Sequence, residues 1–365
     1  MKAGIYIHVP FCAKKCPYCD FYSAAYRADT AERYTEAVLR NIAALPAGLP
    51  ADTVYFGGGT PSMLPPAHIE RILRAIRERC DAAADAEITL EANPLTMTDA
   101  KLSAWRESGI NRLSVGVQSF QPDVLAQLGR KHTPEQAVSA VNRAAAAGFP
   151  NLSVDLMVGL AVQSEKLVSD DLRIVSELPV AHISTYMLKI EEGTPFAECP
   201  PDLLSDDEQA SRYLRIHDVL TAEGFLHYEI SNFAKAGFES RHNNKYWQCA
   251  PYYGIGPAAH SQNRGIRYAV PPDLTAFLDA AVQSTELTDS APLGDSERIM
   301  LGLRLREGVD LACYPAHSAE ILRRAKPLIP QFLHLDGSRL TMTPEGWLMQ
   351  NAVLLRILPD SEVNG

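Results

Sequence analysis

The sequence contains no apolar run that approaches the ~20 residues a helix needs to cross a membrane, which argues against an integral membrane protein. It also lacks long basic runs. Its 34 Lys and Arg residues are outnumbered by 44 Asp and Glu residues, and the formal net charge at pH 7 is −10. So acidic a chain is a poor partner for nucleic acid, although a local basic pocket for carboxylates or phosphates is compatible with these numbers. No signal peptide precedes the first apolar segment, so we expect a cytoplasmic protein.

Cysteine is scarce, with seven residues in 365. The odd number fits a reducing cytoplasm better than a disulfide framework. Three of them, Cys12, Cys16 and Cys19, form a C-x3-C-x2-C array directly after the apolar segment Ile5–Val9. The other four are scattered and are expected to be small buried hydrophobic residues; they are Cys80, Cys199, Cys249 and Cys313.

Three thiolates this close together suit an iron–sulfur cluster or a metal ion better than they suit packing. A closed structural zinc site needs four ligands, and no C-x2-C or H-x3-H partner pair occurs elsewhere in the sequence. A cubane cluster held by three cysteines leaves one iron free to bind a small molecule. By itself the array leaves the zinc interpretation and an incidental arrangement open.

The first two thirds of the sequence alternates β-branched runs with amphipathic segments. Strands are expected at residues 5–9, 53–56, 87–91, 112–117, 153–157 and 182–188, and helices at 31–44, 66–80, 98–108, 134–147, 165–177 and 206–223. Asp29, Thr98, Thr133 and Ser205 stand where N-caps are wanted. Six βα units predict a parallel sheet, either open or as an incomplete barrel, with ligands at the carboxyl ends of its strands.

Distinctive polar or flexible residues follow five of these strands. The cysteines follow the first strand, and Gly57–Thr60 follow the second and allow close backbone approach to a ligand. Glu91 and Gln118 end the third and fourth strands, and Asp155 lies within the apolar fifth. Because an isolated buried carboxylate is costly, Asp155 is expected to face a ligand-lined interior.

Six segments together resemble the oxygen-independent coproporphyrinogen III oxidases and their relatives, a family of radical S-adenosylmethionine (SAM) proteins. They are IYIHVPFCAKKCPYCDF, YFGGGTPS, EANP, NRLSVGVQSF, LGRKH and NLSVDLM. Three later segments, EISNFA, HNNKYW and GIGPAAHS, look like the haem-chaperone branch of that family. The resemblance implies an α/β fold, a partial (β/α)6 TIM-like barrel that carries a [4Fe-4S] cluster and SAM, with a smaller C-terminal domain.

The resemblance also implies roles for individual residues. Cys12, Cys16 and Cys19 would bind three irons, and Tyr6, Gly58 and Glu91 match positions that contact the cluster-bound SAM. Positions that contact a second SAM in the oxidase are matched by Tyr18, Gly59, Thr60, Gln118, Arg130 and Asp155. His242 matches the proposed haem ligand, and a neutral imidazole beside Tyr and Trp suits that role. The alternative for His242 is a histidine that is hydrogen-bonded within a polar loop.

Two departures from the oxidase pattern bear on activity. Where the oxidase has a fourth cysteine, two residues after the third, this sequence has Phe21, and only four residues precede the first strand. Both features are typical of the chaperone branch and put decarboxylase activity in doubt.

The composition changes beyond about residue 269. Helices are expected at residues 273–281, 296–306, 318–325 and 346–357, with a hairpin of residues 332–335 and 340–343 around a D-G turn. This order predicts an α+β, winged-helix-like module without a basic DNA-recognition face, and hence a lid or a protein-docking role. The expected domains are a barrel over residues 1–225, a haem-motif connection over 226–268 and an oxidase-type C-terminal domain over 269–365.

The sequence therefore predicts a radical SAM-type protein that carries haem as cargo to acceptor haemoproteins such as respiratory enzymes and depends on an electron donor. Coproporphyrinogen III oxidase is the alternative activity, and a non-catalytic fold with structural zinc is a third interpretation.

Overall fold

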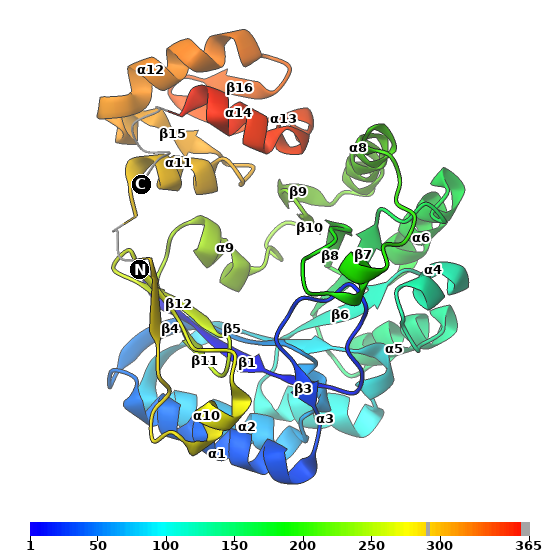
Figure 1. Ribbon diagram of the computed structural model, residues 1–365, viewed down its shortest axis with the longest axis vertical. Coiled ribbons are helices and arrows are strands. Elements are labelled where there is room, and N and C mark those ends of the chain that lie inside the picture. The colour runs from blue at the N-terminus through cyan, green and yellow to red at the C-terminus, as the bar shows by residue number, and fades with distance from the viewer. Residues whose placement is uncertain (290–292, 359–365) are drawn as a thin grey trace.

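The computed structural model describes residues 1–289 and 293–358. Six parallel strands lie side by side in sequence order, and each is followed by a helix on the outer side of the sheet (Figure 1). The strands are β1 (Ala3–Val9), β4 (Leu49–Gly58), β5 (Cys80–Ala92), β6 (Arg112–Gln118), β7 (Asn151–Val158) and β8 (His182–Met187). The main helices are α1 (Ala28–Ala44), α2 (Pro66–Arg79), α3 (Asp99–Ser108), α5 (Pro134–Ala146), α6 (Glu165–Glu177) and α8 (Asp206–Ala222).

The six βα units confirm the expected incomplete barrel. Within the described residues β1 pairs with β4 and β11, whereas β8 pairs with β7 and β10, so the first and sixth strands do not close a ring. Strands that are buried on both faces have nearly continuous apolar sequences. In β1, Ile5, Ile7 and Val9 are fully buried.

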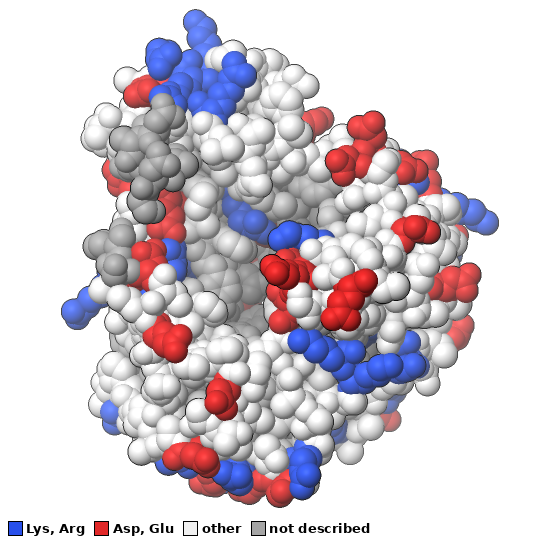
Figure 2. All heavy atoms as spheres, viewed as in Figure 1, with Lys and Arg blue, Asp and Glu red and all other residues white. Residues whose placement is uncertain are grey.

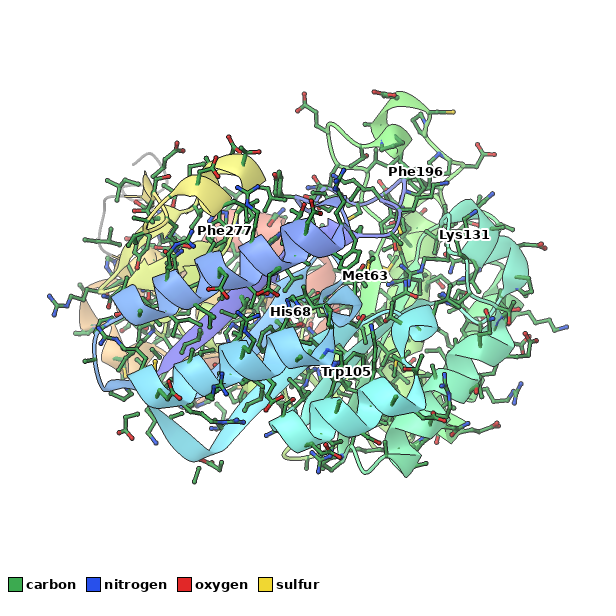
Figure 3. The ribbon with its side chains drawn as sticks, turned by 90° about the horizontal axis from the view of Figure 1, so that it is seen from below. Met63, His68, Trp105, Lys131, Phe196 and Phe277 are labelled. Carbon is green, nitrogen blue, oxygen red and sulfur yellow. The ribbon has the colours of Figure 1, made fainter. Side chains whose placement is uncertain are left out.

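Helix ends follow the expected capping chemistry with one exception. The side chains of Thr98, Thr133 and Ser205 accept a hydrogen bond from the backbone N–H three residues on. The expectation for Asp29 is wrong: α1 begins at Ala28, and the Asp29 carboxylate pairs with the Arg27 side chain instead. Figure 3 shows α1, α2 and α3 side by side, with His68 between α1 and α2, where its Nδ1 lies 2.8 Å from Thr35 Oγ1.

The sheet continues beyond the six expected strands. At one end, β11 (Tyr252–Ile255) runs parallel to β1 and is followed by antiparallel β12 (His260–Asn263), β13 (Ile266–Ala269) and β14 (Glu286–Asp289). At the other end lie β10 (Asn232–Ala234) and β9 (Leu226–Glu229). The short helix α9 (Arg241–Trp247) lies on the face of the sheet opposite the outer helices (Figure 1).

A second hydrophobic core lies in the C-terminal part. It is built on α11 (Asp295–Gly302), α12 (Pro315–Ala325), α13 (Pro344–Leu348), α14 (Gln350–Ile357) and a sheet of β15 (Val309–Asp310), β17 (Arg339–Met342) and β16 (Leu333–Asp336). The expected hairpin is confirmed by the pairing of β16 with β17, whereas the single helix expected at 346–357 is two helices.

The helix expected at 273–281 is α10 (Leu274–Asp279), which packs on α1 in the larger core, with the Phe277 ring 5.8 Å from that of Tyr34 (Figure 3). The expected domain boundaries stay a prediction. No helix of the described residues is long and apolar enough to cross a bilayer. Of the four scattered cysteines, Cys80 and Cys249 are buried as expected, but Cys199 and Cys313 are exposed. Cys199 directly follows the short helix α7 (Pro195–Glu198), and Cys313 ends the 3-10 helix Leu311–Cys313.

Candidate functional site

A cavity of about 440 Å³ opens at the carboxyl ends of the parallel strands. We call it the first cavity. It brings together eleven of the predicted site residues: Cys12, Cys16, Tyr18, Cys19, Gly58, Gly59, Thr60, Glu91, Gln118, Arg130 and Asp155. They come from five strands and the loops that follow them, so the parallel sheet is what places them at one rim.

The three clustered thiols are free and partly exposed in this cavity. Arg130 Nη1 lies 3.7 Å from Cys16 Sγ, and Cys12 Sγ lies 3.5 Å from Thr60 Oγ1. Burial raises the pKa of the Cys19 thiol, so a bound cation would be needed to favour its thiolate. Among the described residues, no three His, Cys, Asp or Glu side chains lie close enough together to hold a single metal ion.

The glycine loop after β4 packs directly behind the cysteine loop. A Cβ on Gly59 would lie 2.8 Å from the Phe11 carbonyl oxygen and 3.1 Å from Cys12 Sγ. Gly58 has a φ of +109°, and a Cβ there would lie 2.8 Å from the His8 ring. Glycine is therefore required at both positions for β4 to approach the thiols so closely.

Two carboxyl groups face the cavity from the interior of the sheet. Burial raises the pKa of Glu91 to about 7, although the Tyr55 hydroxyl donates a hydrogen bond to it at 2.8 Å. Burial also raises the pKa of Asp155, whose Oδ1 accepts a hydrogen bond from Ser114 at 3.1 Å. A ligand that carries positive charge would favour their ionised forms.

Two polar atoms at the first cavity are buried without a partner, namely Gln118 Oε1 and Arg130 Nε. Gln118 also has a φ of +73°, a strained backbone conformation for a residue other than glycine. Unsatisfied polar atoms are rare in folded proteins and are costly. These atoms fit a polar ligand that offers both an acceptor and a donor, while the two acidic groups favour positive charge elsewhere on it and the three free thiols suit a metal cluster beside it.

A second cavity, of about 780 Å³, adjoins the first. Asp20, Phe21, Glu91 and Tyr186 line both. The second cavity is rich in aromatic rings, with Tyr6, Tyr22, Tyr55, Tyr246, Trp247 and Tyr252 on its wall, and it contains Arg267 and Arg304. The surface in Figure 2 is hollowed in this region, between the C-terminal part and the barrel.

Tyr6 lies on the wall of the second cavity rather than the first, and its hydroxyl lies 3.2 Å from His8 Nδ1. Sequence reasoning missed most of this cavity. Its aromatic residues come from widely separated segments, and an isolated tyrosine in a strand is usually a core residue.

His242 does not line either cavity. It is fully buried, its Nδ1 lies 2.8 Å from Thr53 Oγ1, and its Nε2 lies 3.0 Å from the Tyr246 hydroxyl. Its ring stacks on that of Tyr55 at 5.1 Å, and burial lowers its pKa to about 3. Its neighbours Tyr246 and Trp247 do line the second cavity. Iron ligation by His242 would require it to give up one of these hydrogen bonds, and the role stays a prediction.

Comparison with known proteins gives two family matches. The model of the radical SAM superfamily matches residues 6–174, and the model of the HemN C-terminal domain matches residues 296–349.

Proteins named "Heme chaperone HemW" are similar over most of the chain. The protein from Lactococcus lactis is 35% identical over 97% of this chain and 97% of its own length, and the one from Bacillus subtilis is 31% identical over 97% and 98%. The Escherichia coli protein is 40% identical over 71% of this chain and 70% of its own. Among solved structures, coproporphyrinogen III oxidase (HemN) from E. coli superposes with a TM-score of 0.83 at 23% identity, covering 98% of this chain and 90% of that chain, which shows the fold.

Proposed function

Because this chain belongs to the HemW family of the radical SAM superfamily, we propose that it binds haem and delivers it to acceptor haemoproteins. The observation that carries the proposal is the pair of adjoining cavities. One is lined by three free thiols and the other by aromatic rings and two arginines, and they share four wall residues.

For the resident cofactors, Cys12, Cys16 and Cys19 would hold a [4Fe-4S] cluster, which supplies an iron without a protein ligand and an electron for SAM. We propose Tyr6, Gly58 and Glu91 as contacts of the cluster-bound SAM. A second SAM would contact Tyr18, Gly59, Thr60, Gln118, Arg130 and Asp155. The polar atoms without partners at Gln118 and Arg130 support this assignment, because a bound nucleotide would satisfy them.

For haem, the second cavity offers a suitable chemistry. Aromatic faces pack against a porphyrin, and guanidinium groups bind carboxylates. Arg304 Nε is 2.9 Å from Glu229 and Arg267 Nη1 is 3.1 Å from Asp289, so haem propionates would share these guanidinium groups with existing partners. The acceptors, for which respiratory enzymes are our first candidates, the electron donor and the cytoplasmic location belong to the same proposal.

The test is a transfer experiment with anaerobically purified, cluster-reconstituted protein. Iron and sulfide analysis should give a cubane in the wild type and little in Cys12→Ala, whereas Cys199→Ala, which removes an exposed cysteine outside the first cavity, should leave the iron content unchanged. Haem-loaded protein should then pass haem to an apo-haemoprotein. Failure to bind or transfer haem would overturn the proposal. Conversion of coproporphyrinogen III to protoporphyrinogen in the presence of SAM would show the oxidase activity instead.

A further inference from the structure

Two histidines line the second cavity, His8 and His260, and of these two only the ring of His260 lacks a hydrogen-bond partner among the described residues. His8 Nδ1 lies 3.2 Å from the Tyr6 hydroxyl and its Nε2 lies 3.0 Å from the Tyr22 carbonyl oxygen. His260 is exposed, and its ring makes no hydrogen bond or ion pair within the described part of the chain. Iron needs an imidazole nitrogen with an available lone pair. His260 offers one without breaking any contact, unlike His8 or the buried His242.

The strand that carries His260 holds it firmly. In β12, alternate residues face the same side, and His260 and Gln262 both line the second cavity. Ser261, between them, is buried and accepts a hydrogen bond from the Gly254 backbone N–H at 2.8 Å. His260 pairs with Ala269 and Gln262 pairs with Arg267 in β13, so an arginine lies across the ladder from this face.

The same cavity contains polar atoms that lack partners. Gln262 is 4% exposed and Asn232 is 5% exposed, whereas Trp247 is partly buried. Gln262 Oε1, Asn232 Oδ1 and Trp247 Nε1 are themselves buried and have no hydrogen-bond partner. All three residues line the second cavity. A buried polar atom left without a hydrogen-bond partner is costly and therefore rare in folded proteins. Three such atoms on one wall indicate a site built for a ligand with polar groups of its own.

We propose that His260 is the axial ligand of the iron of a haem held in the second cavity. The side chains of Gln262, Asn232 and Trp247 would then form hydrogen bonds with polar groups of the haem or with water bound to it. The inference rests on the proposed haem-carrying function and deepens it. His242 then acts as a positioning residue: its Nε2, 3.0 Å from the Tyr246 hydroxyl, holds that aromatic ring on the cavity wall.

The experiment is a haem titration of full-length, cluster-containing protein, followed by difference spectra against haem-free protein and by magnetic circular dichroism. The variants are His260→Ala, His260→Met, His242→Ala and, as a matched control, His334→Ala, which removes an exposed histidine on β16. His260→Ala should abolish the imidazole-ligated Soret band and weaken haem binding at least roughly tenfold. Added imidazole should restore the band, and His260→Met should give the spectrum of a thioether-ligated haem.

His242→Ala should keep the imidazole-ligated spectrum, with weaker affinity because Tyr246 loses its support. His334→Ala should match the wild type. An unchanged spectrum in both His260 variants, or loss of imidazole ligation in His242→Ala alone, would overturn the assignment while leaving haem binding intact. Absence of haem binding in the wild type would instead overturn the proposed function and this inference together, so the two failures are distinguishable.

Discussion

At the scale of single residues, the pKa of Glu91 shows how strongly burial acts on a carboxyl group of the first cavity. Burial raises its carboxyl pKa from 4.5 to about 7. Because this folded-state pKa lies above that of the unfolded chain, folding takes up a proton between about pH 4.5 and 7, and stability falls as the pH rises through that window. We expect Glu91→Gln to raise the free energy of unfolding of the cofactor-free protein by on the order of 2 kcal/mol at pH 8 and by little near pH 4.

The measurement is urea unfolding of wild type and variant under anaerobic conditions at both pH values. Glu198→Gln, which changes an exposed glutamate, is the control and should have no effect at either pH. A Glu91→Gln effect of equal size at pH 4 and pH 8 would show that burial does not perturb this carboxyl group.

Gly58 gives a second prediction at the residue scale, because both its positive φ and the nearby His8 ring require glycine at this position. Gly58 and Gly148 both have positive φ, but a Cβ on Gly58 would meet the His8 ring whereas one on Gly148 would meet nothing within 4 Å. Gly148→Ala should therefore cost only backbone strain, about 1 kcal/mol. Gly58→Ala should cost more and should also lower iron incorporation. Thermal unfolding and iron content per chain measure the two effects, and equal losses would rule out the steric contribution.

Single residues could be predicted from the sequence where an unusual residue type meets a strand end. Cys12 and Gly59 satisfy this condition, Asp155 is identified as a carboxylate within an apolar strand, and all three line the first cavity. His260 and Tyr186 could not be predicted in the same way. Their exposure to the second cavity depends on which segments pack around them, and a histidine or tyrosine in a strand is equally common in a core.

At the scale of elements, the long βα units were predictable and the short elements were not. The strands of the barrel have apolar sequences because one face of the sheet is covered by helices and the other faces the barrel interior. In contrast β12 has the sequence HSQN, and its Gln262 is buried on the wall of a cavity that distant segments complete. The seven-residue α9 is too short to show a helical period, so the sequence predicts only a motif-bearing connection there.

Helix α9 depends on a buried carboxylate from the barrel, which gives a prediction at this scale. Glu87 on β5 is 5% exposed, and its two oxygens accept hydrogen bonds from the Arg241 and His242 backbone N–H groups at 3.0 Å. Glu87→Ala should cost about 2 kcal/mol of stability, because it removes a charged acceptor from a helix N-terminus. Faster hydrogen exchange of the α9 amides, and weaker haem binding through Tyr246, should accompany this loss.

The matched control is Asp85→Ala, which removes an exposed carboxylate 3.5 Å from the Arg241 side chain and should cost less than about 0.5 kcal/mol. Wild-type exchange rates of the α9 amides in Glu87→Ala would show that the Glu87 carboxylate does not stabilise this helix.

At the scale of the whole molecule, the C-terminal part completes the second cavity. Leu301 and Arg304, at the end of α11 and just after it, lie on its wall. Arg304 is held there by the fully buried Glu229 and by the Trp247 ring, 4.1 Å away. A cargo in the second cavity would therefore contact the barrel, α9 and the C-terminal part at once. Its release requires either that these parts separate or that an acceptor approaches from the open side in Figure 2.

The shared wall of the two cavities leads to the last prediction. Asp20, Phe21, Glu91 and Tyr186 line both cavities, so a ligand in one constrains side chains that the other ligand contacts. We expect haem to change the affinity for SAM, and thermodynamic linkage requires SAM to change the affinity for haem by the same factor. Phe21 is 59% exposed and follows the cysteine array by two residues, so Phe21→Ala should reduce this factor towards one without unfolding the protein. Calorimetric titration of each ligand with and without the other measures both ratios. Ratios of one in the wild type would mean that the two cavities act independently, and haem carriage would then need no signal from the cluster.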